Sequence, residues 1–559
     1  MKPRKVVVAG ALGECVHVAG VMNFLRLAEE AGWQTVFLGP AVAVDQIVQA
    51  ARDRQATLVG VSYRLTPETG ERLLAEFAEA ADDLAQTGVQ FAFGGTPPVA
   101  DRARAFAGFF DAVFDGSETP ADVLAYLRSG SPPVAASDYP GTLVERIAWQ
   151  APYPLLRHHF GLPTLAATRA GIEQIAAAKV LDVISLGIDQ DAQENFFHPD
   201  RQDPRRTGAG GVPVRSADDY RLLYAASRRG NFPLMRTYSG TDDFVRLAEL
   251  YLDTIRLAWA AVPLFWFNQM DGRGPYDLES SIRAHQELIA WYAAHDVPVE
   301  LNEPHHWGMR DAPDVVFVVA GYLSAYNAWG FGVRDYVAQL MFNSPPGVAD
   351  AMDLAKMLAV LELIEPLASK PRPEVLVANG WLPDSGFRIH RQTRVGLLSH
   401  PLDPEAARGH LAAATYLQMA LNPQIVHVVG HTEADHAATA ADVIAACTVA
   451  RRAIENAVRG APDMTVDPAV QARKRDLMAE ATTTLAAIRQ LAPSAVADPL
   501  LDPPTLARAV TSGILDAPQL RNNPFGRGAI RTRMVAGACV AVDAAGQPLT
   551  EQDRLAALQ

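Results

Sequence analysis

Three groups of residues within the first hundred positions could form a binding slot for a flat ligand. His17 lies in a loop at 10–20, Ser62 ends one short apolar run, and Gly94-Gly95 end another. A serine at one strand end and paired glycines at the next leave little side-chain bulk, so a planar heterocycle could enter between them. The loop lacks the pattern G-x-G-x-x-G and therefore carries no dinucleotide fingerprint. A lone loop histidine is often only solvated or helix-capping, so the prediction depends on the three groups meeting.

Two later stretches combine imidazole with carboxylate. Residues 303–306 (Glu-Pro-His-His) and 431–436 (His-x-Glu-x-x-His) hold the ligand types of a zinc or two-metal hydrolase. Neither stretch has an established metal-ligand spacing. We expect His305 and His306 to line a pocket instead, as substrate hydrogen-bonding groups or as packed residues. A metal-dependent barrel hydrolase stays open as an alternative.

The elements that must position the first groups alternate between strand and helix over residues 4 to about 130. Apolar spacings of three and four predict helices, for example over 18–31 and 70–85. Strands covered by helices on both faces form a parallel, doubly wound sheet, here flavodoxin-like, that binds ligands beyond its carboxyl edge. The short β-branched runs that predict these strands are 5–9, 35–38, 57–62, 91–93 and 112–114.

A second alternating region follows a stretch rich in Ser, Pro and Gly. Several of its predicted strands end in polar residues, which is where a (β/α)8 TIM-type barrel builds its site. Residues 195–213 suit an active-site loop or a disordered insertion equally well. The predicted strands are 164–167, 180–185, 264–268, 297–301, 339–342 and 425–429. We expect a doubly wound, Rossmann-like α/β domain at 1–130, a linker at 131–152, the barrel at 153–502, and a C-terminal extension at 503–559 packing on the barrel.

The slot residues resemble the cobalamin-binding domain of the glutamate mutase family. That domain carries D-x-H-x-x-G, then a serine after the third strand, then Gly-Gly. The resemblance implies that His17 is the lower cobalt ligand and that the displaced nucleotide base enters the slot. The family's aspartate, which normally orients and polarises the imidazole, is Cys15 here. The implied cofactor-binding residues are Cys15, His17, Gly20, Ser62, Gly94 and Gly95.

Residues 150–555 resemble the larger, substrate-binding subunit of the same family. In that subunit three arginines clamp substrate carboxylates, and guanidinium groups bind carboxylates through paired hydrogen bonds. The resemblance implies that Glu433 holds the adenosyl ribose. Ala261 stands where the family has a glutamate for the substrate's amino group, which favours a non-amino acid, although Asp271 could replace that carboxylate. The substrate-site residues implied are Arg169, Arg206, Arg236 and Asp271, with His305 beside them.

Together the two resemblances imply that one chain fuses what the family divides between two subunits. The expected function is that of an adenosylcobalamin-dependent radical carbon-skeleton mutase acting on a small carboxylic or dicarboxylic acid. Two alternatives remain from other classes: a cobalamin sensor or corrinoid carrier without mutase activity, and the metal-dependent hydrolase. A corrinoid carrier should have a helical cap before its cobalamin domain, whereas this chain enters its first strand near residue 5.

The composition limits which binding partners and which cellular compartment we expect for the protein. The chain has 559 residues and a net charge of −14, which argues against a nucleic-acid partner. No run of about twenty uncharged apolar residues predicts a membrane span. Cys15, Cys447 and Cys539 lie far apart, which fits a reducing cytoplasm. We expect a small carboxylate as the substrate and a homodimer as the assembly.

Overall fold

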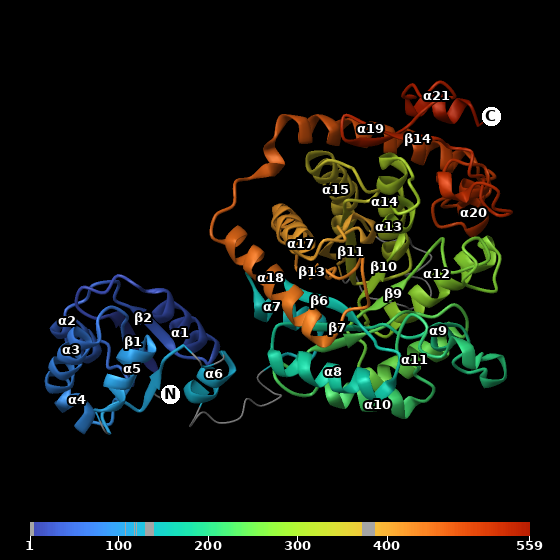
Figure 1. Cartoon of the computed structure of the whole chain (residues 1–559). Helices are drawn as coiled ribbons and strands as arrows, with labels where there is room; N and C mark the ends of the chain where they lie inside the picture. The colour runs from blue at the N-terminus through green and yellow to red at the C-terminus, as the bar shows by residue number, and fades with distance from the viewer. Residues whose placement is uncertain are drawn as a thin grey trace. The chain divides into compact units, whose positions relative to one another are not determined.

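Residues 5–106, 108–116, 118, 120–128, 139–371 and 386–558 are described by a computed structural model. The chain divides into two units, Met1–Pro133 and Val134–Gln559 (Figure 1). None of the described helices is both long and apolar enough to cross a membrane.

A five-stranded parallel sheet in the order β2-β1-β3-β4-β5 forms the centre of the first unit. Side chains alternate along β1, so that Val6 and Val8 pack into one buried cluster while Val7 and Ala9 pack into another. The strands are β1 Val6–Ala11, β2 Gln34–Phe37, β3 Leu58–Tyr63, β4 Gln90–Gly95 and β5 Ala112–Phe114. The helices are α1 Ala19–Glu30, α2 Val44–Asp53, α3 Pro67–Ala80, α4 Asp82–Gln86, α5 Pro97–Arg104 and α6 Pro120–Arg128.

The strand order creates a crevice at one edge of this sheet. The chain leaves β1 for β2 on one side and then returns to β3 on the other side. The loops that follow β1 and β3 therefore diverge, and doubly wound sheets bind ligands at such a switch point. This topology confirms the predicted flavodoxin-like domain.

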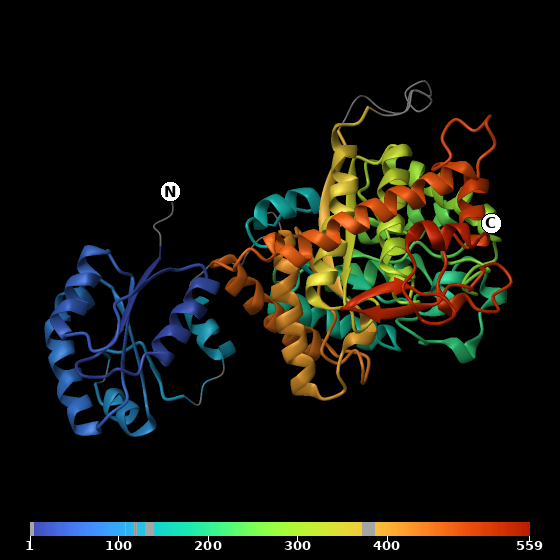
Figure 2. The same ribbon diagram turned by 90° about the horizontal axis from the view of Figure 1, so that it is seen from above.

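Eight parallel strands in consecutive order form the second unit (Figures 1 and 2). The sheet runs β8-β7-β6-β13-β12-β11-β10-β9, and the amide of Ala258 donates to the carbonyl of Met235 at 2.8 Å between its two end strands. The predicted (β/α)8 barrel is confirmed. Its strands are β6 Leu155–Phe160, β7 Val183–Leu186, β8 Leu234–Arg236, β9 Ala260–Val262, β10 Val299–Leu301, β11 Asp335–Phe342, β12 Arg388–Val395 and β13 Ile425–His427.

Helices surround these strands, and α14 is buried on nearly every side because β11, α15 and α19 all pack against it. A hairpin of β14 Thr532–Val535 and β15 Ala538–Ala541 follows near the C-terminus. The helices are α7 Leu143–Gln150, α8 Leu165–Ala178, α9 Gln190–Glu194, α10 Ala217–Ala226, α11 Phe244–Ile255, α12 Leu278–Ala294, α13 Glu303–Gly308, α14 Asp314–Gly330, α15 Asp350–Ile364, α17 Pro404–Gln418, α18 Ala440–Val458, α19 Pro468–Gln490, α20 Pro503–Thr511 and α21 Glu551–Ala556.

Two predicted strands of the barrel are wrong. Residues 164–167 begin helix α8, because the Thr164 hydroxyl accepts from the amide of Ala167 and caps the helix. Residues 264–268 form a buried loop after β9, since Pro263 has no amide hydrogen with which to extend the strand ladder.

Helix α7 lies inside the segment expected to be a linker, residues 131–152. Arg146 on this helix is 1% exposed, and its guanidinium donates to the carbonyls of Pro140, Asn231 and Phe232. These bonds attach α7 to the amino-terminal side of β8, so this part of the segment belongs to the barrel unit. The C-terminal residues also contact the barrel, where the Asn523 side chain donates to the carbonyl of Met270.

Candidate functional site

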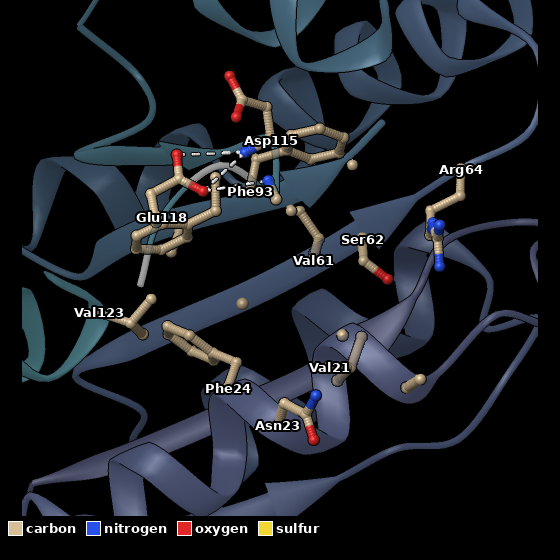
Figure 3. A pocket seen from close by; sticks show the side chains of 18 of the residues that line it. Val21, Asn23, Phe24, Val61, Ser62, Arg64, Phe93, Asp115, Glu118 and Val123 are labelled. Carbon is tan, nitrogen blue, oxygen red and sulfur yellow. Dashed lines mark hydrogen bonds between the residues drawn. The ribbon is translucent and has the colours of Figure 1, made fainter. Parts of the chain in front are cut away.

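A cavity of about 490 Å³ lies at the carboxyl edge of β1, β3 and β4 (Figure 3). Apolar side chains from α1 and the sheet, including Val21, Phe24 and Val61, form much of its wall. The cavity brings together five of the residues predicted from the sequence: His17, Gly20, Ser62, Gly94 and Gly95.

Glycines keep this cavity deep. A Cβ on Gly94 would have no atom within 4 Å, so any side chain there would occupy the open space of the cavity itself. A Cβ on Gly60 would lie 3.2 Å from both Ala9 and Phe24, so the floor of the cavity has little room for a side chain at this position. Gly60 is a residue that the sequence analysis missed, and an isolated glycine inside a predicted strand was the available signal.

The unsatisfied hydroxyl of Ser62 indicates that the cavity binds a ligand. Ser62 is 6% exposed, it lines the cavity, and its Oγ has no hydrogen-bond partner among the described residues (Figure 3). Buried polar atoms in proteins are normally hydrogen-bonded, because an unmet hydrogen bond is costly away from water. A ligand atom in the cavity would satisfy this hydroxyl.

His17 lies exposed in the loop between β1 and α1. Its Nδ1 is 4.0 Å from the sulfur of Cys15, which is fully buried. The neighbouring Glu14 accepts a hydrogen bond from the Tyr63 hydroxyl at 2.8 Å, which lowers the pKa of Glu14 and directs it away from His17. A thiol is a weak hydrogen-bonding group, so Cys15 orients and polarises the His17 ring less strongly than a carboxylate at this position would.

The far wall of the cavity is held by a short turn after β5. The Glu118 carboxylate accepts from the backbone amides of Asp115 and Gly116, each at 3.1 Å (Figure 3). The result is a narrow apolar slot with one unmet hydroxyl and an imidazole at its mouth. These residues fit the nucleotide base and lower face of cobalamin.

A second cavity, of about 310 Å³, lies at the carboxyl end of the barrel strands. Its wall is dominated by positively charged and imidazole side chains rather than apolar ones. The charged and imidazole residues lining it are Arg157, Arg236, Arg273, Arg394, His158, His159, His305, His306, His427, Glu300 and Glu433.

Of the three predicted clamp arginines, Arg236 alone lines this cavity. Arg169 is exposed on α8, where its Nε donates to Glu173 at 3.2 Å. Arg206 ends a turn of 3-10 helix at Pro204–Arg206 and pairs with Glu194 at 2.6 Å. The structure therefore corrects the predicted clamp: α8 begins where a strand was expected and turns Arg169 outward, and local acids hold Arg206 in a folded loop.

Three arginines that the sequence analysis missed join Arg236 at the cavity. Arg157 lies on β6, Arg273 follows β9, and Arg394 lies on β12. Two of them lie in strands whose sequences are largely polar: Arg157 in Leu-Leu-Arg-His-His-Phe and Arg394 in Arg-Ile-His-Arg-Gln-Thr-Arg-Val, so neither run shows the apolar pattern that predicts a buried strand.

Glu300 is the buried carboxylate that Arg157 and Arg236 share. Its Oε2 lies 3.1 Å from Arg236 and 3.6 Å from Arg157, and it accepts from the indole of Trp259 at 2.6 Å. Burial opposes ionisation, but the two guanidinium groups outweigh it and lower the pKa of Glu300. Arg157 also donates to Ser185 and to Gln392, so its hydrogen-bonding capacity is largely used.

The cavity histidines are uncharged. Burial lowers the pKa of His305, His306 and His427 well below the usual value, and nearby charges add to the effect. The Nδ1 atoms of these three rings have no hydrogen-bond partner among the described residues, and neither does the Asn302 side-chain oxygen. The predicted residue His305 thus lies in the cavity with unused hydrogen-bonding capacity.

Asp271 is not among the residues that line the cavity. Its carboxylate accepts from the amides of Phe267 and Asn268 and pairs with Arg273 at 2.6 Å. It therefore positions Arg273 rather than facing a substrate. Glu433 follows β13 and lies exposed at the cavity rim.

The stretches 303–306 and 431–436 do not converge on a metal site. Within the described ranges, the one group of histidine and acid side chains with ligand atoms within 4.8 Å of one another is His198, Asp242 and Asp243. These residues line neither cavity.

Comparisons with known proteins identify the family of the first unit. Residues 5–125 match the B12 binding domain family. Over 127 residues the chain is 30% identical to glutamate mutase sigma subunit 1 of Haloarcula marismortui, which covers 22% of this chain and 84% of that subunit.

Two solved structures are also similar. One is a cobalamin-binding protein of Desulfitobacterium hafniense DCB-2, with 22% identity, a TM-score of 0.20, and coverage of 23% of this chain and 60% of that one. The other is the monomethylamine corrinoid protein of Methanosarcina barkeri, with 20% identity, a TM-score of 0.18, and coverage of 22% and 57%. The chain thus spans less than two thirds of either solved chain. Through its N-terminal unit, which is a cobalamin-binding domain, the chain belongs to the family of the glutamate mutase sigma subunit.

Proposed function

We propose that the protein is an adenosylcobalamin-dependent mutase that rearranges the carbon skeleton of a small carboxylic or dicarboxylic acid. The observation that carries the proposal is the joining, in one chain, of a cobalamin-binding domain and a barrel with an arginine-lined cavity at its carboxyl end. When bound, this cofactor supplies a radical through homolysis of its cobalt–carbon bond.

In the first unit, His17 would serve as the lower cobalt ligand and the slot would hold the nucleotide base. Ser62 would hydrogen-bond that base through the hydroxyl that has no partner among the described residues. Gly60 and Gly94 admit the base because neither carries a side chain that would fill the cavity. Cys15 supports His17 in place of the family's aspartate.

In the barrel, the residues bind the acid and keep solvent away from reactive intermediates. Buried arginines attract the carboxylate, and the neutral imidazoles supply hydrogen bonds without adding charge. Glu433, which lines the cavity, would hold the ribose of the adenosyl group. Exclusion of water and of competing hydrogen donors is what radical chemistry requires of a protein, more than acid–base power.

The test is electron paramagnetic resonance of the full-length protein loaded with adenosylcobalamin, before and after addition of candidate acids without oxygen. Turnover should begin with a Co(II) signal that develops only when a substrate acid is present. Cobalamin binding without any acid-dependent signal, across a panel of mono- and dicarboxylic acids, would instead favour a sensor or a corrinoid carrier. A failure to bind cobalamin would contradict the whole proposal.

A further inference from the structure

The barrel cavity holds more positive charge than its paired carboxylates neutralise. Arg157 and Arg236 share Glu300, while Arg273 pairs with Asp271. Two acids thus serve three of the cavity's arginines, and the fourth is Arg394.

Arg394 makes no ion pair with any described acid. Its side chain lies on β12 and is 6% exposed, and its one hydrogen bond is from Nε to the carbonyl of Val395 at 3.4 Å. A guanidinium stays protonated in proteins, and a buried charge without a partner is strongly unfavourable. The side chain also lines the cavity, so an anion entering it would meet this group.

An uncharged polar region lies near this arginine. The rings of His305 and His306 have centroids 4.1 Å apart, and the positive charge of Arg394 is one cause of the lowered pKa of both. Their Nδ1 atoms and the side-chain oxygen of Asn302 have no partners among the described residues. The Asn302 oxygen can accept from a hydroxyl, and each Nδ1 can accept from a hydroxyl or, in the tautomer that carries its proton there, donate to a carbonyl.

An ammonium group would find one unpaired carboxylate among the described residues that line the cavity, that of the exposed Glu433, whose charge already acts on Arg394. Glu300 is fully buried and shared between two arginines, and Asp271 is held by Arg273 and two backbone amides. Ala261, within β9, carries no charge. A desolvated ammonium near the surplus arginines would therefore be repelled, and only the exposed Glu433 would offset its charge.

We propose that Arg394 anchors the substrate carboxylate and that His305, His306 and Asn302 receive an uncharged hydroxyl or keto group, so that the substrate is a non-amino acid. This inference rests on the proposed function for the identity of the cavity as the substrate site. It makes Arg394 a binding residue and the imidazole pair the determinant of specificity.

The test is calorimetric binding of matched acids to the full-length protein without cobalamin. The probes are 2-hydroxyglutarate against glutamate, and lactate against alanine, which differ by hydroxyl against ammonium. At least one hydroxy acid should bind about 30-fold or more tightly than its amino partner, and Arg394→Gln should weaken that binding by about 30-fold or more. Arg169→Gln removes the same charge from an exposed helix position and should leave the affinity unchanged.

Arg394→Lys guards against a folding artefact, because it keeps the charge in the barrel. It should bind more weakly than the wild type and more tightly than Arg394→Gln, since lysine cannot make the paired hydrogen bonds. Equal binding of amino and hydroxy acids, unchanged affinity in both Arg394 variants, or no binding of any probe would overturn the inference. Arg394-dependent binding without acid-dependent Co(II) formation would overturn the mutase proposal alone.

Discussion

The slot in the first unit and the cavity in the barrel select their ligands by opposite means. The slot is shaped by missing side chains at Gly60 and Gly94 and by apolar walls, with a single unmet hydroxyl. The barrel cavity is shaped by buried arginines and neutral imidazoles drawn from many strands. Variants should therefore affect the slot through volume and the barrel cavity through charge.

Acid should affect the barrel more strongly than any single substitution. Burial lowers the pKa of His158 and His285 to about 4, and it also lowers the pKa of His159, His305, His306 and His427 well below the usual value. Below about pH 6.5 the unfolded chain binds protons that these folded histidines exclude, so stability falls with pH. Each of these six histidines should lower the free energy of unfolding by about 1 kcal/mol between pH 6.5 and 5.5, so the total loss should be several kcal/mol.

Glu303 acts in the opposite direction. Burial raises its pKa from 4.5 to about 8, so the stability that it contributes is full below about pH 4.5 and is lost progressively as the pH rises from there through 8. Urea unfolding of the barrel should consequently show a stability maximum near neutral pH. Glu303→Gln should remove the fall in stability between about pH 6.5 and 8 and should keep or steepen the loss of stability below pH 6.5. A flat wild-type profile would contradict the prediction that the buried histidines are uncharged.

Removing the shared acid should come next in size. Glu300→Gln leaves Arg157 and Arg236 buried without a counter-charge and should destabilise the barrel by about 3–5 kcal/mol. Glu173→Gln is the matched control, because Glu173 also lies between two arginines, Arg169 and Arg229, but at the surface. That control should change stability by no more than about 0.5 kcal/mol in chemical denaturation. Equal effects would mean that burial does not govern these pairs.

Filling the slot should weaken cobalamin binding without a comparable effect on the barrel. Gly94→Leu places a side chain in the open space of the cavity and should reduce affinity by about 10- to 100-fold, measured by the visible spectrum of bound cobalamin. Gly141→Leu adds the same bulk where a Cβ also meets nothing, but away from the slot, and should have no effect on affinity. An unaffected Gly94→Leu protein would show that the base does not enter here.

Restoring the acid beside the lower ligand should give the smallest change, and one of opposite sign. Cys15→Asp offers His17 a carboxylate and should tighten cobalamin binding by about 10-fold, at the lower end of typical outer-shell effects. Cys15→Asn has nearly the same shape without the charge and should not reproduce the gain. A weaker affinity in Cys15→Asp would mean that this buried position has adapted to the thiol.

The contrast between the two units also explains what could be predicted from the sequence. The strands of the first unit lie within a residue or two of their predicted positions, and the central strands β1 and β3 are buried along their whole length and almost continuously apolar. Ser62 and Gly94 lie near the ends of β3 and β4, and His17 lies in the loop after β1, so locating these strands also located the site residues.

Strands β6 and β12, which line the charged cavity, were among the barrel strands that were missed. Strands β6 and β12 carry Arg157, His159 and Arg394 toward the interior, so their sequences resemble polar loops. Without β6, the first predicted strand fell on α8, and Arg169 was assigned to the clamp. The sequence therefore indicated a barrel with an anion site, but not which arginines form that site.

The Glu300 cluster also stabilises the closure of the barrel. Strands β8 and β9 have three residues each, and the amide of Ala258 bonding to Met235 is the link between them noted above. Arg236 ends β8, Trp259 directly precedes β9, and Glu300 lies on β10, so Glu300 fastens three successive segments by their side chains. Side-chain contacts of Glu300 therefore reinforce a barrel closure that has few backbone hydrogen bonds. The same carboxylate, with its two arginines, also contributes to the electrostatic field that an acid entering the cavity meets.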